Sequence, residues 1–214
     1  MYPPSLQELV SATDKYEKPT RRVHELWQTD FTQFKVIYWG WYYLSTVLDD
    51  YSRYILSWKL SPTMNADDVE ETLMMALKKS GLEQARVRHR PRLLTENGPA
   101  YLSKDLARFL KRKHFEHIRG APYHPMTQGK IERFHRSMKN VILLQNYYSP
   151  SGLKKTLAEF VEYYNNERYH ESLDNLTPAD IYFGKFEEVL TRREETKRKT
   201  MQQRRSQNLQ PVHV

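Results

Sequence analysis

The chain has 214 residues, and its 34 Lys and Arg against 26 Asp and Glu give a net charge of +8 at pH 7. This surplus favours a polyanionic partner, either nucleic acid or an anionic membrane surface. The sequence contains no cysteine, which excludes disulfides and thiolate zinc sites, so hard cations held by carboxylate oxygen are the natural metal candidates.

No apolar run approaches the roughly 20 residues that are needed to span a bilayer. The first residues also lack the apolar core of a signal peptide. We therefore expect a cytoplasmic protein with no membrane partner.

Three strands are predicted near the start of the chain. Residues 1–24 are polar and carry prolines, so we expect an extended lead-in. Residues 27–34 alternate, with Trp27 and Asp30 on opposite faces, and residues 41–50 form a nearly unbroken apolar run that is typical of a buried strand. Residues 53–60 follow the turn-like DDYSR, so the three strands should form an antiparallel meander.

Helices and short strands alternate after this meander. In chain order we predict a helix capped by Asn65, a short strand from Arg92, a helix capped by Ser103, a short strand at 115–118, a long helix at about 127–144, a helix through Leu153 and Tyr164, and a short helix capped by Thr177. This order predicts an α/β fold in which helices flank a mixed five-stranded sheet. We expect residues 25–184 to form one core and residues 185–214 to form a basic, solvated helix or tail.

Three acids lie within these elements or directly beside them. Asp30 is in the first strand, Glu96 directly follows the fourth, and Glu132 is in the first turns of the long helix. If the first and fourth strands are neighbours, these carboxylates converge at one sheet edge, where they would repel each other without a cation or bound protons. Two divalent ions held there would suit phosphodiester chemistry.

Basic residues surround Glu132 in the segment GAPYHPMTQGKIERFHRSMK. Glu132, Arg136 and Lys139 share one helix face, so one interpretation places a metal-binding acid among phosphate-binding cations. The other interpretation is an ordinary surface ion pair between Glu132 and Arg136, worth about 0.3 to 0.5 kcal/mol. The conspicuous pair Asp49 and Asp50 is better explained by turn capping and pairing with Arg53.

Several motifs occur together in a fixed order. They are ELWQTDFT around Asp30, LLTENGPAY around Glu96, YHPMTQGKIERFHRSMK around Glu132, and YYNNERYHESLDNLTPADIYFG further on; 35 residues, positions 97 to 131, separate the second and third acids. Over residues 25–184 the chain resembles the integrase catalytic core of bacterial insertion-sequence transposases, the DDE or rve type, which is similar to retroviral integrases.

This resemblance implies a ribonuclease H-like fold and a specific activity. The expected function is metal-dependent DNA strand cleavage and 3'-hydroxyl strand transfer by a DNA transposase or integrase core. It implies that Asp30, Glu96 and Glu132 are catalytic and hold two Mg²⁺ or Mn²⁺ ions. It further implies a homo-oligomer on DNA, binding transposon ends and target. Related transposases carry an N-terminal helix-turn-helix reader, which this chain is expected to lack.

We expect five residues to contact DNA, namely Lys130, Arg136, Lys139, His124 and Gln128. The three cations would bind phosphates without reading bases. For His124 the alternative is a hydrogen bond that satisfies the loop backbone. For Gln128, beside Gly129, the alternative is a plain helix-entry turn.

The sequence departs from the family pattern at the second acid, where Glu96 stands in place of aspartate. The extra methylene moves the carboxylate oxygens by about 1 Å, and metal-assisted chemistry tolerates little misplacement. Glu96 is a compensated natural variant, a mark of a copy that no longer cuts, or a deliberate change. The alternative functions are accordingly a non-catalytic DNA-binding protein derived from a transposase, or a structure-selective nuclease of similar fold.

Overall fold

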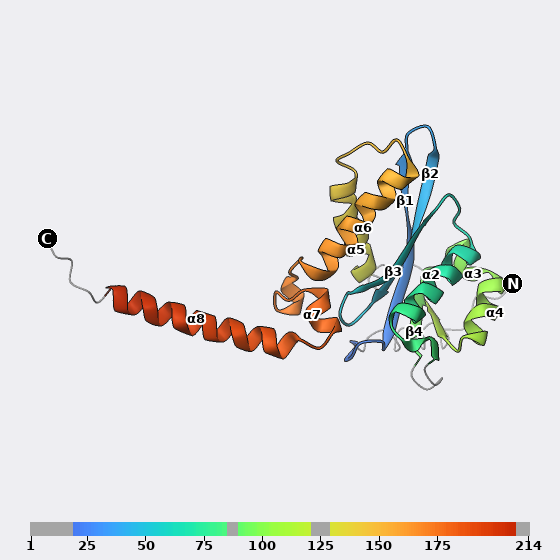
Figure 1. The fold of residues 1–214 in the computed structure, drawn as a ribbon. Coiled ribbons are helices and arrows are strands. Elements are labelled where there is room, and N and C mark those ends of the chain that lie inside the picture. The colour runs from blue at the N-terminus through green and yellow to red at the C-terminus, as the bar shows by residue number, and fades with distance from the viewer. Residues whose placement is uncertain (1–18, 85–89, 121–128, 209–214) are drawn as a thin grey trace, which may run out of the picture. The chain divides into compact units, whose positions relative to one another are not determined.

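The computed structural model describes residues 19–84, 90–120 and 129–208. Five strands of this part form one mixed sheet in the order β3-β2-β1-β4-β5 (Figure 1). Their bounds are β1 Leu26–Val36, β2 Gly40–Asp49, β3 Ile55–Ser61, β4 Arg92–Thr95 and β5 Glu116–Arg119. The β1–β2 and β2–β3 pairs are antiparallel, and the β1–β4 and β4–β5 pairs are parallel. The predicted meander and mixed five-stranded sheet are confirmed.

The strand β1 lies at the centre of the sheet, and both faces of its first half are covered. Consecutive residues Trp27, Gln28 and Thr29 are each buried, although only the first is apolar. The turn that joins β2 to β3 is fixed by Asp49, whose Oδ1 accepts from the Ser52 N–H at 2.9 Å and from the Ser52 hydroxyl at 2.7 Å. The turn-capping role predicted for Asp49 is therefore confirmed.

The helices begin largely where the sequence predicts. They are α2 Ala66–Lys79, α3 Pro99–Leu102, α4 Lys104–Arg112, α5 Gly129–Ile142, α6 Pro150–Asn166, α7 Pro178–Tyr182 and α8 Phe186–Asn208. The predicted caps of α2, α4 and α7 are confirmed: the side chains of Asn65, Ser103 and Thr177 each accept from an N–H in the first turn. The short helix α3 is not predicted by the sequence pattern, and the predicted start of the long helix near 127 lies outside the described residues.

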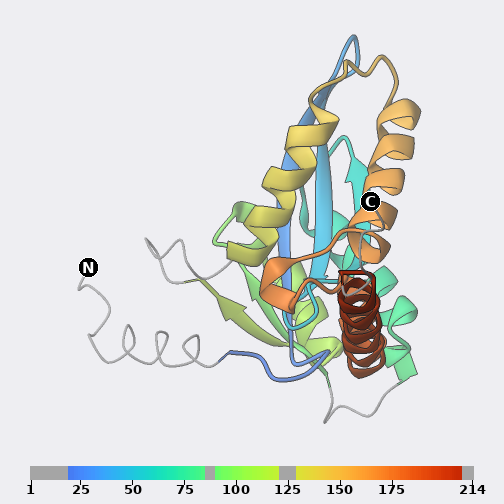
Figure 2. The ribbon, with the colours of Figure 1, turned by 90° about the vertical axis from the view of Figure 1, so that its left-hand side faces the viewer.

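The helices α2 and α5 cover opposite faces of the sheet. The hydroxyl of Ser57 donates to the carbonyl of Thr72 in α2 at 2.7 Å. The next residue, Trp58, pairs with Thr46 across the β2–β3 ladder, and the Thr46 hydroxyl lies 3.4 Å from His135 Nε2 in α5. Successive residues of a strand point to opposite faces, so these two contacts assign the two helices to different sides. Figure 2 shows α5 alongside the central strands.

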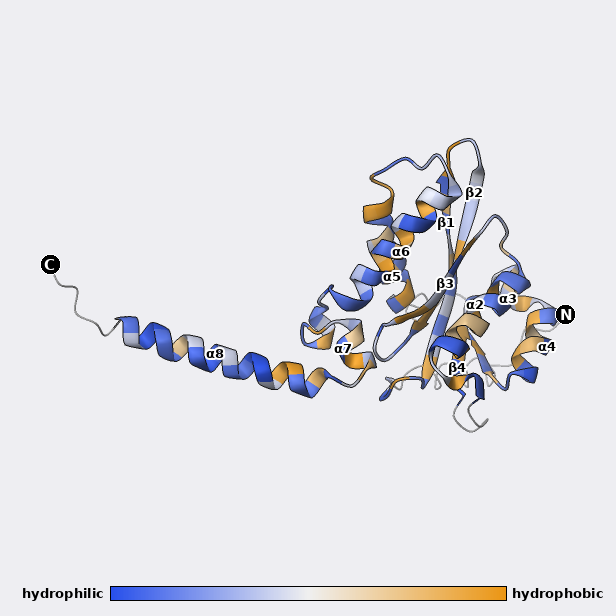
Figure 3. Cartoon of the chain, viewed as in Figure 1, coloured by the Kyte–Doolittle hydropathy of each residue, from blue (hydrophilic) through white to orange (hydrophobic). Residues whose placement is uncertain are grey.

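The described chain divides into two compact units, Met1–Tyr163 and Tyr164–Val214, with the division inside α6. In the second unit Arg193 of α8 donates to the carbonyls of Asp174 at 3.3 Å and Asn175 at 2.8 Å, and its guanidinium lies over the Tyr169 ring. Figure 3 shows α8 as mostly hydrophilic, which agrees with the predicted solvated helix. The predicted boundaries of the lead-in, core and tail at residues 24 and 184 stay predictions.

Among the helices of the described ranges, none combines the length and the apolar character of a membrane-crossing segment.

Candidate active site

The three predicted acids come from three elements and face the same side of the sheet. The parallel register of β1 and β4 pairs Gln28 with Leu94. Extending this register by two residues places Glu96, directly after β4, beside Asp30 on the face that α5 covers. Glu132 lies in the first turn of α5. The sheet order thus supplies the neighbouring strands that the convergence of these acids requires.

Electrostatics show that the three carboxylates share one neighbourhood. The pKa of Glu96 is raised, first by burial of its carboxyl and then by the negative charges of Asp30 and Glu132. Glu96 as a residue is exposed, so burial of its carboxyl is only partial. The mutual repulsion that the sequence predicts for these acids is therefore present in the fold.

Asp30 is the most constrained of the three acids. Its Oδ1 accepts from the Phe31 N–H at 2.7 Å, and its Oδ2 lies 3.3 Å from His135 Nδ1 in α5. Both side chains are nearly buried, with 13% and 8% exposed for Asp30 and His135. Because His135 also contacts Thr46 through Nε2, its ring orientation is fixed from both nitrogens.

Carboxylate oxygens are suitable ligands for a hard divalent cation, but the three acids do not lie close enough together to surround one. Nowhere in residues 19–84, 90–120 and 129–208 do three His, Asp or Glu side chains converge closely enough to hold a metal ion. Asp30 is turned toward His135, and Glu96 extends from an exposed position. The arrangement is an open cluster of negative charge in which the ligand types fit Mg²⁺ or Mn²⁺.

A buried tyrosine borders this cluster. Tyr101 lies in α3, five residues after Glu96, and its ring centroid is 5.8 Å from that of Phe31. Burial raises the pKa of Tyr101 well above its ordinary value, and the charges of Asp30 and Glu96 raise it further, although the Thr29 hydroxyl opposes them. Tyr101 therefore stays neutral.

The turn that carries Glu96 is tied to β5. The side-chain amide of Asn97 donates to the Gly120 carbonyl at 2.9 Å, and the Gly120 N–H donates to the Thr95 carbonyl at 3.0 Å. The turn-shaping role that the sequence assigns to Asn97 agrees with this contact.

The basic residues of α5 differ in their surroundings. Arg136 is exposed and Lys139 is half-buried, and within the described part of the chain neither forms an ion pair with a carboxylate. The surface ion pair between Glu132 and Arg136 is likewise not found there. Lys130 differs, because its ammonium lies 2.7 Å from Asp50 Oδ2. The predicted contacts of His124 and Gln128 lie outside the described residues.

Sequence reasoning misses four residues that shape this site, namely Gln28, Asp50, Tyr101 and His135. Two of them carry a signal: Gln28 lies two residues before Asp30 on the same strand face, and His135 lies three residues after Glu132 on the same side of its helix. The sequence pattern presents Asp50 only as a turn residue. Nothing in the sequence pairs it with Lys130, 80 positions away.

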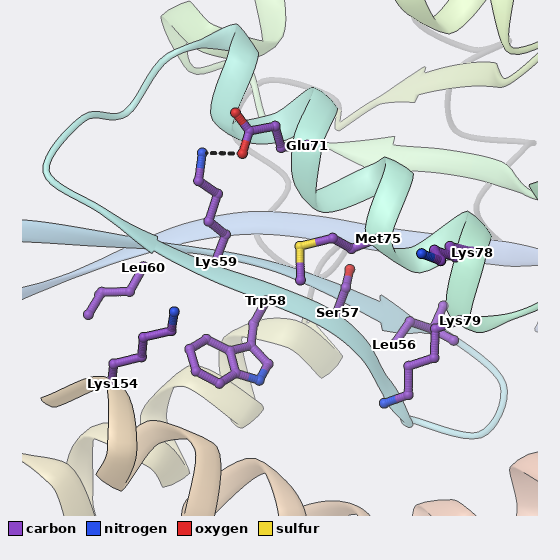
Figure 4. Close-up of a pocket in the computed structure, with 10 residues that line it drawn as sticks. All are labelled: Leu56, Ser57, Trp58, Lys59, Leu60, Glu71, Met75, Lys78, Lys79 and Lys154. Carbon is purple, nitrogen blue, oxygen red and sulfur yellow. Dashed lines mark ion pairs between the residues drawn. The ribbon is translucent and has the colours of Figure 1, made fainter. Parts of the chain in front are cut away.

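A groove of about 740 Å³ lies elsewhere in the first unit, along the edge strand β3 (Figure 4). Its lining residues are Leu56, Ser57, Trp58, Lys59, Leu60, Glu71, Met75, Lys78, Lys79 and Lys154. The one acid of this lining, Glu71, pairs with Lys59 at 2.6 Å. None of the three predicted acids lines the groove, so it is separate from the candidate active site.

Two family models match the chain, and both are described as an integrase core domain. The first covers residues 20–125 and the second covers residues 113–178. The segments that hold Asp30 and Glu96 lie in the first match, and the segment that holds Glu132 lies in the second.

Curated relatives include mobile-element and viral proteins. The chain is 29% identical over 163 residues to the transposase InsF for insertion sequence IS3A of Escherichia coli strain K12, covering 74% of this chain and 54% of that protein. It is 31% identical over 134 residues to the Gag-Pro-Pol polyprotein of sheep pulmonary adenomatosis virus, covering 61% of this chain and 7% of the polyprotein. The chain thus spans about half the length of the transposase it matches.

Solved structures share the fold. The HTLV-2 integrase catalytic core domain in complex with magnesium, dimeric form, superposes with a TM-score of 0.58 at 21% identity, covering 75% of this chain and 97% of that one. The simian T-cell lymphotropic virus intasome in complex with PP2A regulatory subunit B56 gamma gives 0.64 at 21% identity, covering 77% and 56%. The mixed sheet with flanking helices is therefore the ribonuclease H-like fold of integrase cores. The two family-model matches, which together span residues 20–178, show that the chain belongs to the integrase core domain family.

Proposed function

We propose that this chain is the catalytic core of a DNA transposase that cleaves DNA strands and transfers the resulting 3'-hydroxyl to a second phosphodiester. The observation that carries the proposal is the β1–β4 register, which when extended sets Glu96 beside Asp30, and the raised pKa of Glu96, to which the charges of Asp30 and Glu132 contribute, supports it. The names of relatives such as the transposase InsF support the reaction class.

Each acid has a distinct role in this proposal. Asp30, fixed by His135 and the Phe31 amide, is the rigid ligand, and Glu132 is presented by the first turn of α5. Glu96 is the adjustable ligand, because it extends from an exposed turn. Divalent ions held by these carboxylates would stabilise the charge of the attacking and leaving oxygens at the phosphodiester.

The DNA partner is proposed from charge and from the family. Arg136 and Lys139 lie one and two turns beyond Glu132 on α5, where they would contact phosphates and fix the register of the strand. The intasome among the similar structures supports a multimer that holds two DNA ends. We propose that the DNA partners are the transposon ends and the target.

A second function is favoured by the open arrangement of the acids. Because Glu96 replaces the family aspartate and no three-ligand group closes among the described side chains, the chain is alternatively a DNA-binding protein that has lost cleavage. In this alternative the basic face of α5 still binds DNA, and only strand cleavage is lost.

The deciding experiment measures Mn²⁺-dependent nicking of a duplex that carries the terminal sequence of the encoding element. We expect nicking by the parent chain, its loss in Asp30→Asn and Glu132→Gln, and a gain of up to about 100-fold in Glu96→Asp, because a displacement of about 1 Å costs that much. A silent parent with an active Glu96→Asp variant supports the second function. Silence of both chains, with DNA binding retained, refutes the proposed transposase activity.

A further inference from the structure

We propose that Gln28, Asp50 and Lys130 act as positioning residues that hold the first turn of α5, and with it Glu132, against β1. We call these three side chains the α5 clamp. The inference rests on the proposed function, since it assigns the clamp to the carboxylate that this function requires. It also replaces the phosphate contact that the sequence predicts for Lys130.

The first part of the clamp is the amide of Gln28, which is 2% exposed. Its Oε1 accepts from the main-chain N–H of Ile131 at 3.1 Å, and its Nε2 donates to Asp50 Oδ1 at 2.6 Å. In the reverse orientation the amide nitrogen would face the Ile131 N–H, and the amide oxygen would face a carboxylate oxygen of Asp50. The network therefore allows only one orientation of this amide. Gln28 thus joins β1, the β2–β3 turn and α5 at one point.

The contact with Ile131 has a specific effect on the helix. Ile131 is the third residue of α5, so its N–H is one of the four that an α-helix leaves without a partner of its own. Gln28 supplies that acceptor from the neighbouring strand. The start of α5 is therefore set by a residue of β1, and Glu132 is the next residue along the helix.

The second part of the clamp is the ion pair between Lys130 and Asp50. The Lys130 ammonium donates to Asp50 Oδ2 at 2.7 Å and to the Asp50 carbonyl at 2.8 Å. Asp50 is 6% exposed, and its Oδ2 also accepts from the Thr20 hydroxyl at 2.6 Å. Two of the three ammonium protons are committed, so a phosphate would have to compete with a buried carboxylate for Lys130.

The spacing of the contacts explains why they control position as well as stability. Gln28 contacts Ile131, and Asp30, two residues further along β1, contacts His135, four residues further along α5. Two strand residues advance about 6.6 Å and four helix residues advance about 6 Å. The spacing of the two contacts along β1 therefore matches their spacing along α5, and Glu132 lies between them on the helix. Without the hydrogen bond that Gln28 accepts from Ile131, the polar contact between β1 and α5 on the N-terminal side of Glu132 is lost, and the one at His135 remains.

The experiment compares three variants of the full chain with the parent. Asp50→Asn and Gln28→Met break the clamp. Asp68→Asn is the matched control, because the Lys59–Asp68 pair, at 3.0 Å and with side chains 26% and 4% exposed, resembles Lys130–Asp50 at 31% and 8%. Asp68 lies in α2 on the opposite face of the sheet from α5, so its replacement lowers stability without touching the clamp.

Two readouts separate position from stability. In the metal-free chain, we expect hydrogen exchange at the Ile131 amide to accelerate in both clamp variants and to stay unchanged in Asp68→Asn. For Mn²⁺ alone, followed by calorimetry, we expect the affinity to fall about 10- to 100-fold in the clamp variants, the usual effect of removing a residue that orients a ligand. Asp68→Asn should keep the parent affinity although its thermal stability falls.

The outcomes distinguish the two proposals. If Mn²⁺ binding is lost in Glu132→Gln but unchanged in Asp50→Asn and Gln28→Met, the positioning role is overturned and the metal site remains. If the parent binds no Mn²⁺ that depends on Glu132, the proposed function fails and takes the positioning role with it, whatever the Ile131 amide shows. Equal losses of Mn²⁺ affinity in Asp68→Asn and the clamp variants would also overturn the inference, since they would reflect general destabilisation.

Discussion

At the scale of single residues, the site depends on polar groups placed inside a sheet. Asp30 and Gln28 lie in the central strand at positions where an apolar side chain would normally pack, and each has a partner in α5. A buried polar group without such a partner is destabilising. The cost of placing these residues in the interior is offset by contacts with one helix, which ties the stability of the sheet to the geometry of the site.

The first prediction concerns the pair of His135 and Asp30. We expect His135→Leu to lower the free energy of unfolding by about 1 to 3 kcal/mol, because it removes the α5 partner of the nearly buried Asp30 carboxylate and leaves the Phe31 amide, among the described residues, as its donor. Urea unfolding measures this change. The neighbouring Arg136→Leu, at an exposed position, should stay within about 0.5 kcal/mol of the parent. A His135→Leu chain as stable as that control would show that the pair contributes nothing.

At the scale of elements, the position of Glu96 depends on how β4 and β5 are joined. Thr95 at the end of β4 donates its hydroxyl proton to the Glu96 carbonyl at 2.9 Å, so it must accept from His117 Nε2 of β5, also at 2.9 Å. His117 is therefore protonated at Nε2 in its neutral form. Its pKa is lowered, first by burial and then by the positive charge of Arg119.

This lowered pKa of His117 predicts a pH dependence. Between its folded pKa and its ordinary value of 6.5, the unfolded chain binds more protons, so this residue makes stability fall as the pH drops below about 6.5. We expect His117→Gln, which keeps an N–H donor for Thr95, to lose less stability than the parent between pH 7 and pH 5. Thermal melts at both pH values test this.

Because the parent contains the same other titrating groups, their contributions cancel when the loss of stability in His117→Gln is compared with that of the parent. His24, whose pKa is also lowered by burial, changes stability in the same direction and is present in both chains. Identical losses of stability in the parent and in His117→Gln would contradict the assignment.

At the scale of the whole molecule, the net charge of +8 determines how the chain meets a polyanion. Charge alone does not separate residues that contact DNA from residues that only add to the field. The structure makes that separation possible on α5, because Lys130 is paired with Asp50 whereas Arg136 and Lys139 are not paired within the described ranges.

The third prediction is the salt dependence of duplex binding. The logarithm of affinity should fall linearly with the logarithm of salt concentration, and Arg136→Gln with Lys139→Gln should make the slope shallower by roughly 0.9 for each phosphate that the variant no longer neutralises. The matched control is Lys104→Gln with Lys111→Gln, two exposed lysines of α4 that remove the same charge. An equal change of slope in both double variants would show that α5 holds no specific phosphate contacts.

Local patterns in the sequence predicted most of the helices and strands and singled out the three acids. Strand alternation, the caps Asn65, Ser103 and Thr177, and the spacing around Glu132 are local properties, because they depend on residues within a few positions of each other. The order of these elements was sufficient to predict a mixed five-stranded sheet, but the sequence left open whether β1 lies beside β4, which the strand order of the structure supplies.

The pairing of the buried polar groups, by contrast, depends on how the chain packs. Lys130 and Asp50 are 80 positions apart, Ile131 and Gln28 are 103 apart, and no local pattern distinguishes a lysine that faces phosphate from one that faces a buried carboxylate. These contacts depend on how α5 packs on β1, because a side chain in the interior bonds to whatever group the fold brings within about 3 Å of it. The sequence identified Glu132 as the acid of α5, whereas the packing of that helix on β1 determined the position of its carboxylate.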